Sequence, residues 1–413
     1  MNKPEILALI PARGGSKGIP RKNIRAFASY PLIAYSIAAG LQSKTVTRVI
    51  VTTDDEEIAE VARSYGAETP FQRPAELAKD RTTDLPVFQH ALRWLAEHED
   101  YHPQAVVHLR PTTPVRPPDL VDRSVAVLQT HAEADSVRGI TPAHQNPFKM
   151  WLMEAEDRPI HPLVTAPGIE EPYNSPRQIL PTAYAHTGLI DIIRPATILE
   201  LNSMSGRTIL PILFDPKYDA DLDTLEDWRR AEQKLLLERP RMVWPGKPPR
   251  RMPEDIRLLV LDFDGVLTDN RVWVDQDGRE MVVANRSDSL GVNRLRQAGV
   301  ETVVISLETN PVVAARCRKM NIPWIQGEKD KATALHKLLK EHNIDADETV
   351  FLGNDVNDLP CFPLVGWAVA VADAMPEVAR QADFVLTRSG GQAAVRELCD
   401  LILEQMADNE GSS

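Results

Sequence analysis

Short apolar runs alternate with amphipathic stretches twice along the chain, and a proline-rich stretch separates the two series. Repeated strand–helix alternation predicts a parallel sheet covered by helices on both faces. The segment 238–255 contains five prolines, which can neither continue a helix nor lie in a central strand. We therefore predict two doubly wound, mostly parallel α/β domains, at 1–240 and 256–408, joined by a linker at 241–255. The expected strands are 6–12, 48–54 and 105–111, then 256–265, 301–306, 349–355, 367–372 and 382–387; expected helices include 31–42, 55–66 and 331–343.

The charge balance and the cysteines narrow the class of protein. The 413 residues carry a formal net charge of −12, which argues against a surface built to follow nucleic-acid phosphates. No run approaches the roughly 18 apolar residues of a membrane-spanning helix. Cys317, Cys361 and Cys399 form no CxxC pair, so we expect reduced thiols. These features predict a cytoplasmic enzyme that binds neither nucleic acid nor membrane.

A loop that follows the first expected strand, IPARGGSKGIPRKN at 10–23, combines glycines with cations. Glycines let backbone N–H groups approach an anion closely. Four cations, Arg13, Lys17, Arg21 and Lys22, lie within ten residues, as a triphosphate site requires. The loop has neither the P-loop nor the GxGxxG spacing. A solvated basic turn is the alternative, but the preceding strand and the density of cations favour a phosphate site.

Further motifs follow this loop in a fixed order over residues 4–235. They are QRPAELAKDRTTD (72–84), LRPTTPVR (109–116), PRQ (176–178) and DADLDT (219–224). With them the first domain resembles the CMP-sialate synthetases, or acylneuraminate cytidylyltransferases, which implies a Rossmann-like nucleotidyltransferase fold. In that family a sugar hydroxyl attacks the α-phosphorus of CTP and pyrophosphate leaves, while the protein positions the groups and neutralises charge. The resemblance implies nucleotide binding by Arg13, Gly14, Gly15, Ser16, Lys17, Lys22, Asn23, Arg73 and Thr82, with Arg13 and Lys17 also catalytic.

Two aspartates, Asp221 and Asp223, match the paired acids that bind Mg²⁺ in this family. Residues i and i+2 of an extended segment point to opposite faces. Both can therefore hold one ion only if the segment turns or if one of them acts through water. Without the other motifs, a surface acidic loop would be the simpler interpretation.

The positions that face the acceptor depart from the family pattern. Arg110 stands where the family commonly has Gln, while AHTG (185–188) and Asp191 replace a sugar-facing stretch and a Tyr. An arginine can hold a carboxylate bidentately. We therefore expect an acidic acceptor, a sialic-acid-like nonulosonate such as ketodeoxynonulosonate, bound by Arg110, Arg177 and Gln178.

The second domain opens with LDFDGVLTDN (261–270), an apolar strand that ends in two aspartates. This motif resembles the DxD signature of the haloacid-dehalogenase superfamily, and the later motifs of that family follow in order. The resemblance implies that Asp262 is the nucleophile that becomes phosphorylated and that Asp264 is the general acid and base. It also implies Mg²⁺, with Asp262, Asp264 and Asp355 as ligands. Ser306 and Lys331 would contact the phosphate, Lys329 is the alternative lysine, and Asp358 would support Asp355. Taken singly, Ser306 would be a strand-end cap and Lys331 a surface lysine.

Only about forty residues separate Asp264 from Ser306, which is too short for a cap domain. They include 270–280, which predicts a β-hairpin. The domain thus resembles the capless subgroup that contains 3-deoxy-octulosonate 8-phosphate phosphatase, which implies a homotetramer closed by the hairpins. The joint prediction is an Mg²⁺-dependent bifunctional enzyme that dephosphorylates a nonulosonate 9-phosphate and transfers CMP from CTP to the sugar. Three alternatives remain: an inactive assembly domain, another acceptor such as 3-deoxy-octulosonate or a phosphonate, and a nucleotide-binding sensor.

Overall fold

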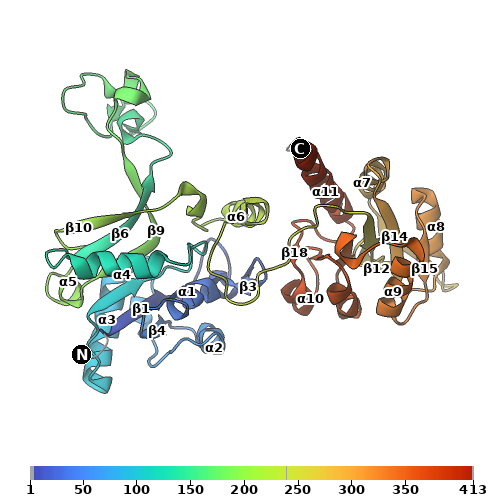
Figure 1. Ribbon diagram of the computed structural model, residues 1–413, viewed down its shortest axis with the longest axis horizontal. Coiled ribbons are helices and arrows are strands. Elements are labelled where there is room, and N and C mark those ends of the chain that lie inside the picture. Colours follow the sequence, from blue (N-terminus) through green and yellow to red (C-terminus); the bar gives the residue numbers. More distant parts are fainter. Residues whose placement is uncertain (1–3, 239, 412–413) are drawn as a thin grey trace. The chain divides into compact units, whose positions relative to one another are not determined.

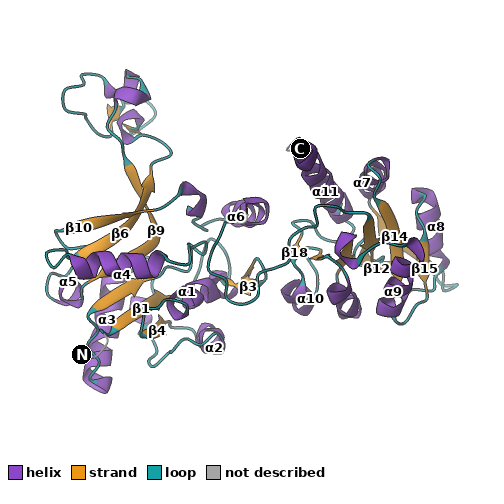
Figure 2. Ribbon diagram, viewed as in Figure 1, coloured by secondary structure: helices purple, strands orange, loops and turns teal. Residues whose placement is uncertain are grey.

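The computed structural model describes residues 4–238 and 240–411, which form two compact units. The first unit extends to Gly246 apart from Ala26–Tyr30, and the second comprises Ala26–Tyr30 and the chain from Lys247 onward. Helices flank the strands in each unit (Figure 2). Both sheets are thus covered as the alternation predicts, and the two-domain α/β class is confirmed. No described helix is long and apolar enough to cross a membrane.

The sheet of the first unit has six strands in the order β10-β6-β9-β5-β1-β4. All neighbours are parallel except β9, which runs antiparallel to both β5 and β6. The inner strand β1, which lies between β5 and the edge strand β4, is wholly apolar and buried up to its last residue, as expected for a strand covered on both faces. The strands are β1 (Ile6–Pro11), β4 (Arg48–Thr52), β5 (Ala105–His108), β6 (Ser136–Pro142), β9 (Tyr184–Ile193) and β10 (Ile209–Leu213).

Helices pack on this sheet through apolar faces. In α1 every residue from Leu32 to Gly40 is buried, whereas α2 buries one face and begins where Asp55 accepts a hydrogen bond from the Ile58 N–H at 3.1 Å. The helices of this unit are α1 (Leu32–Leu41), α2 (Glu56–Ser64), α3 (Asp84–Glu99), α4 (Leu120–Thr130), α5 (Pro195–Leu199) and α6 (Leu225–Glu238).

An arm between β6 and β9 projects from the sheet of the first unit (Figure 1). It contains a small antiparallel pair, β7 (Trp151–Leu152) with β8 (His161–Pro162), and short 3₁₀ turns at Pro147–Lys149, Pro172–Asn174 and Arg177–Ile179. The strand–helix pattern of the sequence did not predict this arm. Its segments are short and mostly exposed, so they lack the periodic burial on which such a prediction depends.

The second unit has a wholly parallel sheet in the order β15-β14-β11-β16-β17-β18. Its strands are β11 (Leu258–Leu261), β14 (Glu301–Ser306), β15 (Trp324–Gln326), β16 (Thr349–Gly353), β17 (Trp367–Ala370) and β18 (Phe384–Val385). Its helices are α7 (Arg286–Gln297), α8 (Pro311–Met320), α9 (Lys331–His342), α10 (Pro376–Gln381) and α11 (Ala394–Gly411). The expected hairpin forms from β12 (Thr268–Val274) and β13 (Glu280–Ala284).

The proline-rich stretch is held by the domains rather than free between them. Val243 is buried in the first unit, and its N–H donates to the Arg116 carbonyl at 2.8 Å. In the second unit the Arg250 guanidinium donates to Asp383 at 2.9 Å and to the Phe362 carbonyl at 2.8 Å. Two stretches of the predicted linker are therefore parts of the two units.

Candidate active sites

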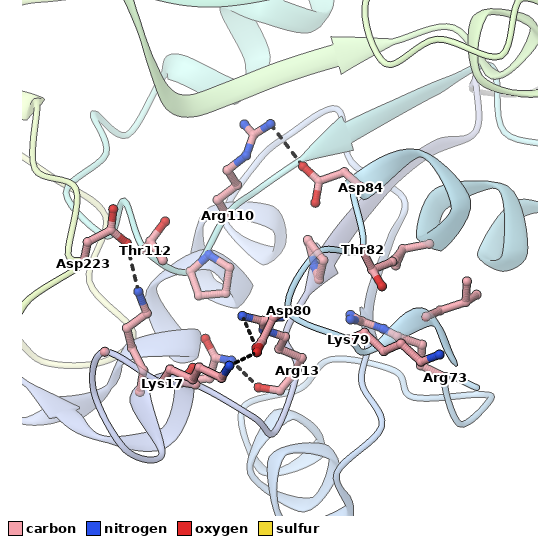
Figure 3. A pocket seen from close by; sticks show the side chains of 18 residues that line it. Arg13, Lys17, Arg73, Lys79, Asp80, Thr82, Asp84, Arg110, Thr112 and Asp223 are labelled. Atoms are coloured by element: carbon pink, nitrogen blue, oxygen red, sulfur yellow. Dashed lines mark hydrogen bonds and ion pairs between the residues drawn. The ribbon is translucent and has the colours of Figure 1, made fainter. Parts of the chain in front are cut away.

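The first unit contains a cavity of about 560 Å³ at the carboxyl ends of β1 and β5, which is where doubly wound sheets place their ligands (Figure 3). The loop after β1, the segment after β5 and the start of α3 surround it. The cavity is lined by Pro11, Arg13, Ser16, Lys17, Gly18, Lys22, Asn23, Arg73, Leu77, Lys79, Asp80, Thr82, Asp84, Val87, Arg110, Pro111, Thr112 and Asp223. Six of these side chains are cationic and three are acidic, so the cavity has an excess of positive charge.

The glycine-rich loop is fixed by contacts at both of its ends. The Gly14 N–H donates to Asp54 at 3.0 Å, and the buried Asn23 amide donates to the Arg13 carbonyl at 3.0 Å. Gly18 lies against the backbone of Asp223, where a Cβ atom would be 2.7 Å from the carbonyl oxygen. Only glycine fits this approach without displacing the loop.

Most of the predicted nucleotide-binding residues come together in this cavity. Arg13, Ser16, Lys17, Lys22, Asn23, Arg73 and Thr82 line it, whereas Gly14 and Gly15 belong to its loop but do not. Arg21 does not contribute to the expected cluster of four cations. Its guanidinium turns away to pair with Asp55 at 2.6 Å and with Glu57.

Asp80 is a cavity residue that sequence reasoning did not assign. Its carboxylate pairs with Arg13 at 3.2 Å and with Lys17 (Figure 3). The hydrogen bond from Lys17 lowers the pKa of Asp80, so it is an anion. The Asp80 carboxylate is therefore paired with the two cations that are expected to hold the triphosphate. The motif that contains Asp80 was recognised, but no local pattern shows that it folds over the loop.

Arg73 is the most buried cation of the cavity. Its Nε donates to the Thr52 hydroxyl at 3.2 Å, and burial lowers the pKa of Arg73 to about 10. The guanidinium is therefore held by the end of β4 and remains charged near neutral pH. Lys79, also unassigned from the sequence, lines the cavity on the segment between Arg73 and Thr82.

The paired aspartates lie beside the glycine-rich loop. Lys22 Nζ donates to the Leu222 carbonyl at 2.7 Å and to Asp223 at 3.2 Å. Asp223 lines the cavity and Asp221 does not. Local desolvation and the neighbouring Asp223 carboxylate raise the pKa of Asp221. Two neighbouring carboxylates, of which one is disfavoured as an anion by the other, form a donor set that a divalent cation would fit.

The predicted acceptor ligands do not lie together. Arg110 lines the cavity, where its guanidinium pairs with Asp191 at 2.9 Å and with Asp84 at 3.4 Å. Arg177 and Gln178 lie instead in an exposed turn of the arm and do not line the cavity of their own chain. Arg177 and Gln178 therefore do not join Arg110 in this cavity, because residues between β6 and β9 leave the sheet.

The second unit has its own cavity, of about 250 Å³, at the carboxyl ends of three neighbouring strands. Asp262 and Asp264 follow β11, Ser306 ends β14, and Asp355 follows β16. Parallel strands bring these residues to one edge of the sheet, as the sequence predicts. The lining residues are Asp262, Asp264, Asn270, Ser306, Leu307, Glu308, Thr309, Asn354, Asp355 and Asn357.

Behind this cavity lies a buried triad. Lys331, the first residue of α9, donates to Asp262 at 2.6 Å and to Asp358 at 2.7 Å. Asp358 also accepts from the Asn354 N–H at 2.9 Å and so fixes the loop that carries Asp355. Lys331, and not Lys329, is therefore the lysine next to the expected nucleophile. Asp358 supports Asp355 through the backbone, and it directly contacts Lys331 as well.

This cavity has more negative charge than its single buried lysine balances. Burial and then the Asp358 charge raise the pKa of Asp262, and burial and then the Glu308 charge raise the pKa of Asp264. Among the residues described, no three His, Cys, Asp or Glu side chains converge closely enough to hold a metal. An ion here would need backbone, water or substrate oxygens beside the carboxylates, and oxygen-rich donors of this kind suit Mg²⁺.

Comparison with known proteins agrees with the two domains. Residues 7–147 match the family model described as cytidylyltransferase, and residues 308–397 match the model described as haloacid dehalogenase-like hydrolase. The fold and the sites thus define a protein that joins a cytidylyltransferase domain to a haloacid-dehalogenase-like hydrolase domain.

Relatives that span almost the whole chain narrow this class. N-acylneuraminate cytidylyltransferase A of Danio rerio is 30% identical over 96% of this chain and 88% of its own. N-acylneuraminate cytidylyltransferase of Oncorhynchus mykiss is 31% identical over 97% of this chain and 89% of its own. The chain therefore belongs to the N-acylneuraminate cytidylyltransferase family.

The second domain also has relatives of its own. The 3-deoxy-D-manno-octulosonate 8-phosphate phosphatase of Escherichia coli is 37% identical over 36% of this chain and 80% of its own. A solved structure of the enzyme of that name from Moraxella catarrhalis, in complex with magnesium, phosphate and the sugar, is 30% identical and covers 38% of this chain and 90% of its own, with a TM-score of 0.37.

Proposed function

We propose that the first domain transfers CMP from CTP to a nonulosonate and releases pyrophosphate. The single observation that supports this most is the cavity in which Arg13, Lys17 and Lys22 from one glycine-containing loop face the Asp223 carboxylate. A polyphosphate needs both features, since the cations neutralise its oxygens and the acids would hold a metal that adds positive charge. The full-length N-acylneuraminate cytidylyltransferase relatives support the acidic sugar as acceptor.

The residues of this cavity have distinct proposed roles. Arg13 and Lys17 exchange the Asp80 carboxylate for the triphosphate, while Lys22 holds the loop against Asp223. Asn23, Arg73 and Thr82 bind the cytidine, and Gly14 and Gly15 give the loop its shape. Arg110 binds the acceptor, whose hydroxyl is placed in line with the leaving pyrophosphate. Ketodeoxynonulosonate is the acceptor that we propose to test first.

We propose that the second domain is an active phosphatase for the 9-phosphate of the same sugar. Asp262 attacks phosphorus and displaces the sugar oxygen, which Asp264 protonates. Asp264 then takes a proton from the water that hydrolyses the aspartyl-phosphate. Ser306 donates a hydrogen bond to the phosphate, and the ammonium of Lys331 holds Asp262 in place. The intact buried triad favours this role over a pure assembly domain, because a domain that serves only assembly has no need for a lysine between two buried carboxylates.

Both sites are proposed to use Mg²⁺. In the first domain Asp221 and Asp223 would hold it, and in the second Asp262, Asp264 and Asp355 would hold it. When bound, the ion neutralises phosphate oxygens and lets anionic groups approach one another.

The second domain also has features that support assembly. Side chains on both strands of the hairpin are apolar and largely exposed, including Trp273, of which 67% is accessible. Exposed apolar patches of this kind mark protein–protein contacts. We propose that the hairpin forms part of a homotetramer interface. The three cysteines are buried and unpaired, which supports a cytoplasmic location.

One experiment separates these proposals. The purified chain is incubated with Mg²⁺, CTP and ketodeoxynonulosonate 9-phosphate, and phosphate, pyrophosphate and CMP-sugar are followed separately. We expect all three products from the unaltered protein. With this substrate Asp262→Asn should release no phosphate and therefore no pyrophosphate, whereas unphosphorylated sugar should restore pyrophosphate release and CMP-sugar formation in that variant. Asp269→Asn, which changes a half-buried carboxylate paired with the exposed Arg271, is the matched control. Pyrophosphate without phosphate would refute the phosphatase role, and phosphate without pyrophosphate would refute the acceptor.

A further inference from the structure

A buried carboxylate beside the first cavity has no role in the chemistry proposed above. Asp191 lies on β9, directly across from His108 of β5 and from Arg138 of β6. Only 2% of its side chain is exposed, and it does not line the cavity. An ionised group in such a place is costly unless several partners compensate for its lost hydration.

The partners of Asp191 are two arginines, Arg110 after β5 and Arg138 within β6. Arg110 Nη1 donates to one carboxylate oxygen at 2.9 Å, and Arg138 Nε donates to the other at 2.8 Å. His186 Nε2 lies 3.5 Å from the second oxygen. Burial alone would raise the pKa of Asp191, but the His186 hydrogen bond and the charges of Arg110 and Arg138 hold it well below its usual range. The carboxylate is therefore an anion that both guanidinium groups share.

Arg110 is held from a second side as well. Its Nη2 lies 3.4 Å from Asp84, and its Nη1 also donates to the Gly188 carbonyl at 3.3 Å. A Cβ at Gly188 would lie 3.3 Å from Arg110 Cδ, and Gly188 has φ of +71°. Glycine at position 188 therefore leaves room for the Arg110 side chain. Arg110 nevertheless lines the cavity and keeps 24% of its side chain exposed.

We infer that Asp191 is a positioning residue for the acceptor: it fixes the direction of Arg110 in the cavity and couples it to Arg138. This inference rests on the proposed function of the cavity. Asp84 and Asp191 balance the charges of the two arginines, so Arg110 acts as a directed donor rather than as a free positive charge. A guanidinium that is already immobile loses less freedom when it binds a carboxylate edge of the acceptor.

The test uses steady-state kinetics of pyrophosphate release by the full-length protein. N-acetylneuraminate and ketodeoxynonulosonate serve as acceptors, and CTP and acceptor are varied separately. The variants are Asp191→Asn, Arg110→Gln and the double variant. Asp122→Asn is the matched control, because Asp122 also accepts several hydrogen bonds in this unit, but from Ser43, Lys44 and Thr45, which do not line the cavity.

Loss of a charge-assisted hydrogen bond predicts a rise of roughly tenfold or more in the acceptor KM of each single variant. We expect the CTP KM to stay within about twofold. The acceptor KM of the double variant should be no higher than that of the more impaired single variant, because both substitutions break the same contact. Additive losses, an unchanged acceptor KM, or an equal rise in the CTP KM would each overturn the inference.

A second measurement does not depend on any acceptor. In nitrogen NMR of arginine side chains, we expect restricted rotation about the Nε–Cζ bonds of Arg110 and Arg138 in the unaltered protein and faster rotation in Asp191→Asn. Fast rotation in both proteins would overturn the inference. If neither sugar is turned over but rotation is restricted only in the unaltered protein, the positioning role of Asp191 stands and the proposed acceptors fail.

Discussion

Replacing Asp262 with asparagine should abolish the phosphatase reaction and stabilise the second domain at the same time. Lys331 lies between two carboxylates whose side chains are almost fully inaccessible, Asp262 at 6% and Asp358 at 0% exposure. One cation between two buried anions leaves one negative charge without compensation. Asparagine keeps the shape and an acceptor oxygen for Lys331, and the pair that remains with Asp358 is neutral overall.

The pKa of Asp262 sets the size of the effect. Burial, followed by the Asp358 charge, raises it from 3.8 to about 7. Each pKa unit corresponds to about 1.4 kcal/mol, so an ionised Asp262 costs at most about 4 kcal/mol of folding free energy. Because local relaxation reduces such penalties, we expect a net gain of about 2–4 kcal/mol for Asp262→Asn above pH 7.

The sign of the pH dependence follows from the same shift. Between the unfolded and the folded pKa, the folded state binds more protons at Asp262 than the unfolded state does. The stability that Asp262 confers therefore falls as pH rises through that window. The advantage of Asp262→Asn should be small near pH 4 and complete above about pH 7.

Urea unfolding of the full-length protein with pulsed hydrogen exchange would measure this effect in the second domain alone. Peptides that cover β11 and β16 report on the sheet that carries the triad, and a chelator removes stabilisation by bound metal. Lys331→Met is the contrasting variant, because it leaves two buried carboxylates without a cation. We expect it to lose about 3–5 kcal/mol, most strongly at high pH. An Asp262→Asn protein that is no more stable at pH 8, or whose advantage does not grow with pH, would refute the reasoning.

Three further substitutions have defined outcomes. Burial raises the pKa of Asp288 to about 6, so Asp288→Asn should stabilise the second domain by about 1–3 kcal/mol at pH 8 but not at pH 4, as measured by the same urea experiment. The fully buried Arg116 guanidinium donates to oxygens of four residues, so Arg116→Met should destabilise the first domain by about 2–4 kcal/mol, seen as a lower thermal midpoint. Gly18→Ala should displace the loop from Asp223 and raise the KM for CTP by about ten- to a hundredfold in the pyrophosphate assay.

Residues that follow a buried strand directly could be predicted from the sequence. Asp262 and Ser306 end apolar runs, and parallel strands bring their carboxyl ends to one edge of a sheet whatever their spacing in the chain. The loop at 10–23 was predictable for the same reason. The pairing of Arg13 with Asp80 was not, because it depends on how the segment after β4 returns across the loop.

The acceptor end of the first cavity shows that the type of a residue predicts its role less well than its position in the fold does. Arg110 was interpreted as a free ligand for a carboxylate, but the fold gives it Asp191 and Asp84 as partners. Asp191 reaches it because β9 inserts antiparallel between β5 and β6, and no periodicity of the sequence indicated that strand. Arg177 belongs to the same connection and is carried away on the arm instead. Two departures from the family pattern, about eighty residues apart, are therefore one contact, and a change at either position alters the direction of the same guanidinium.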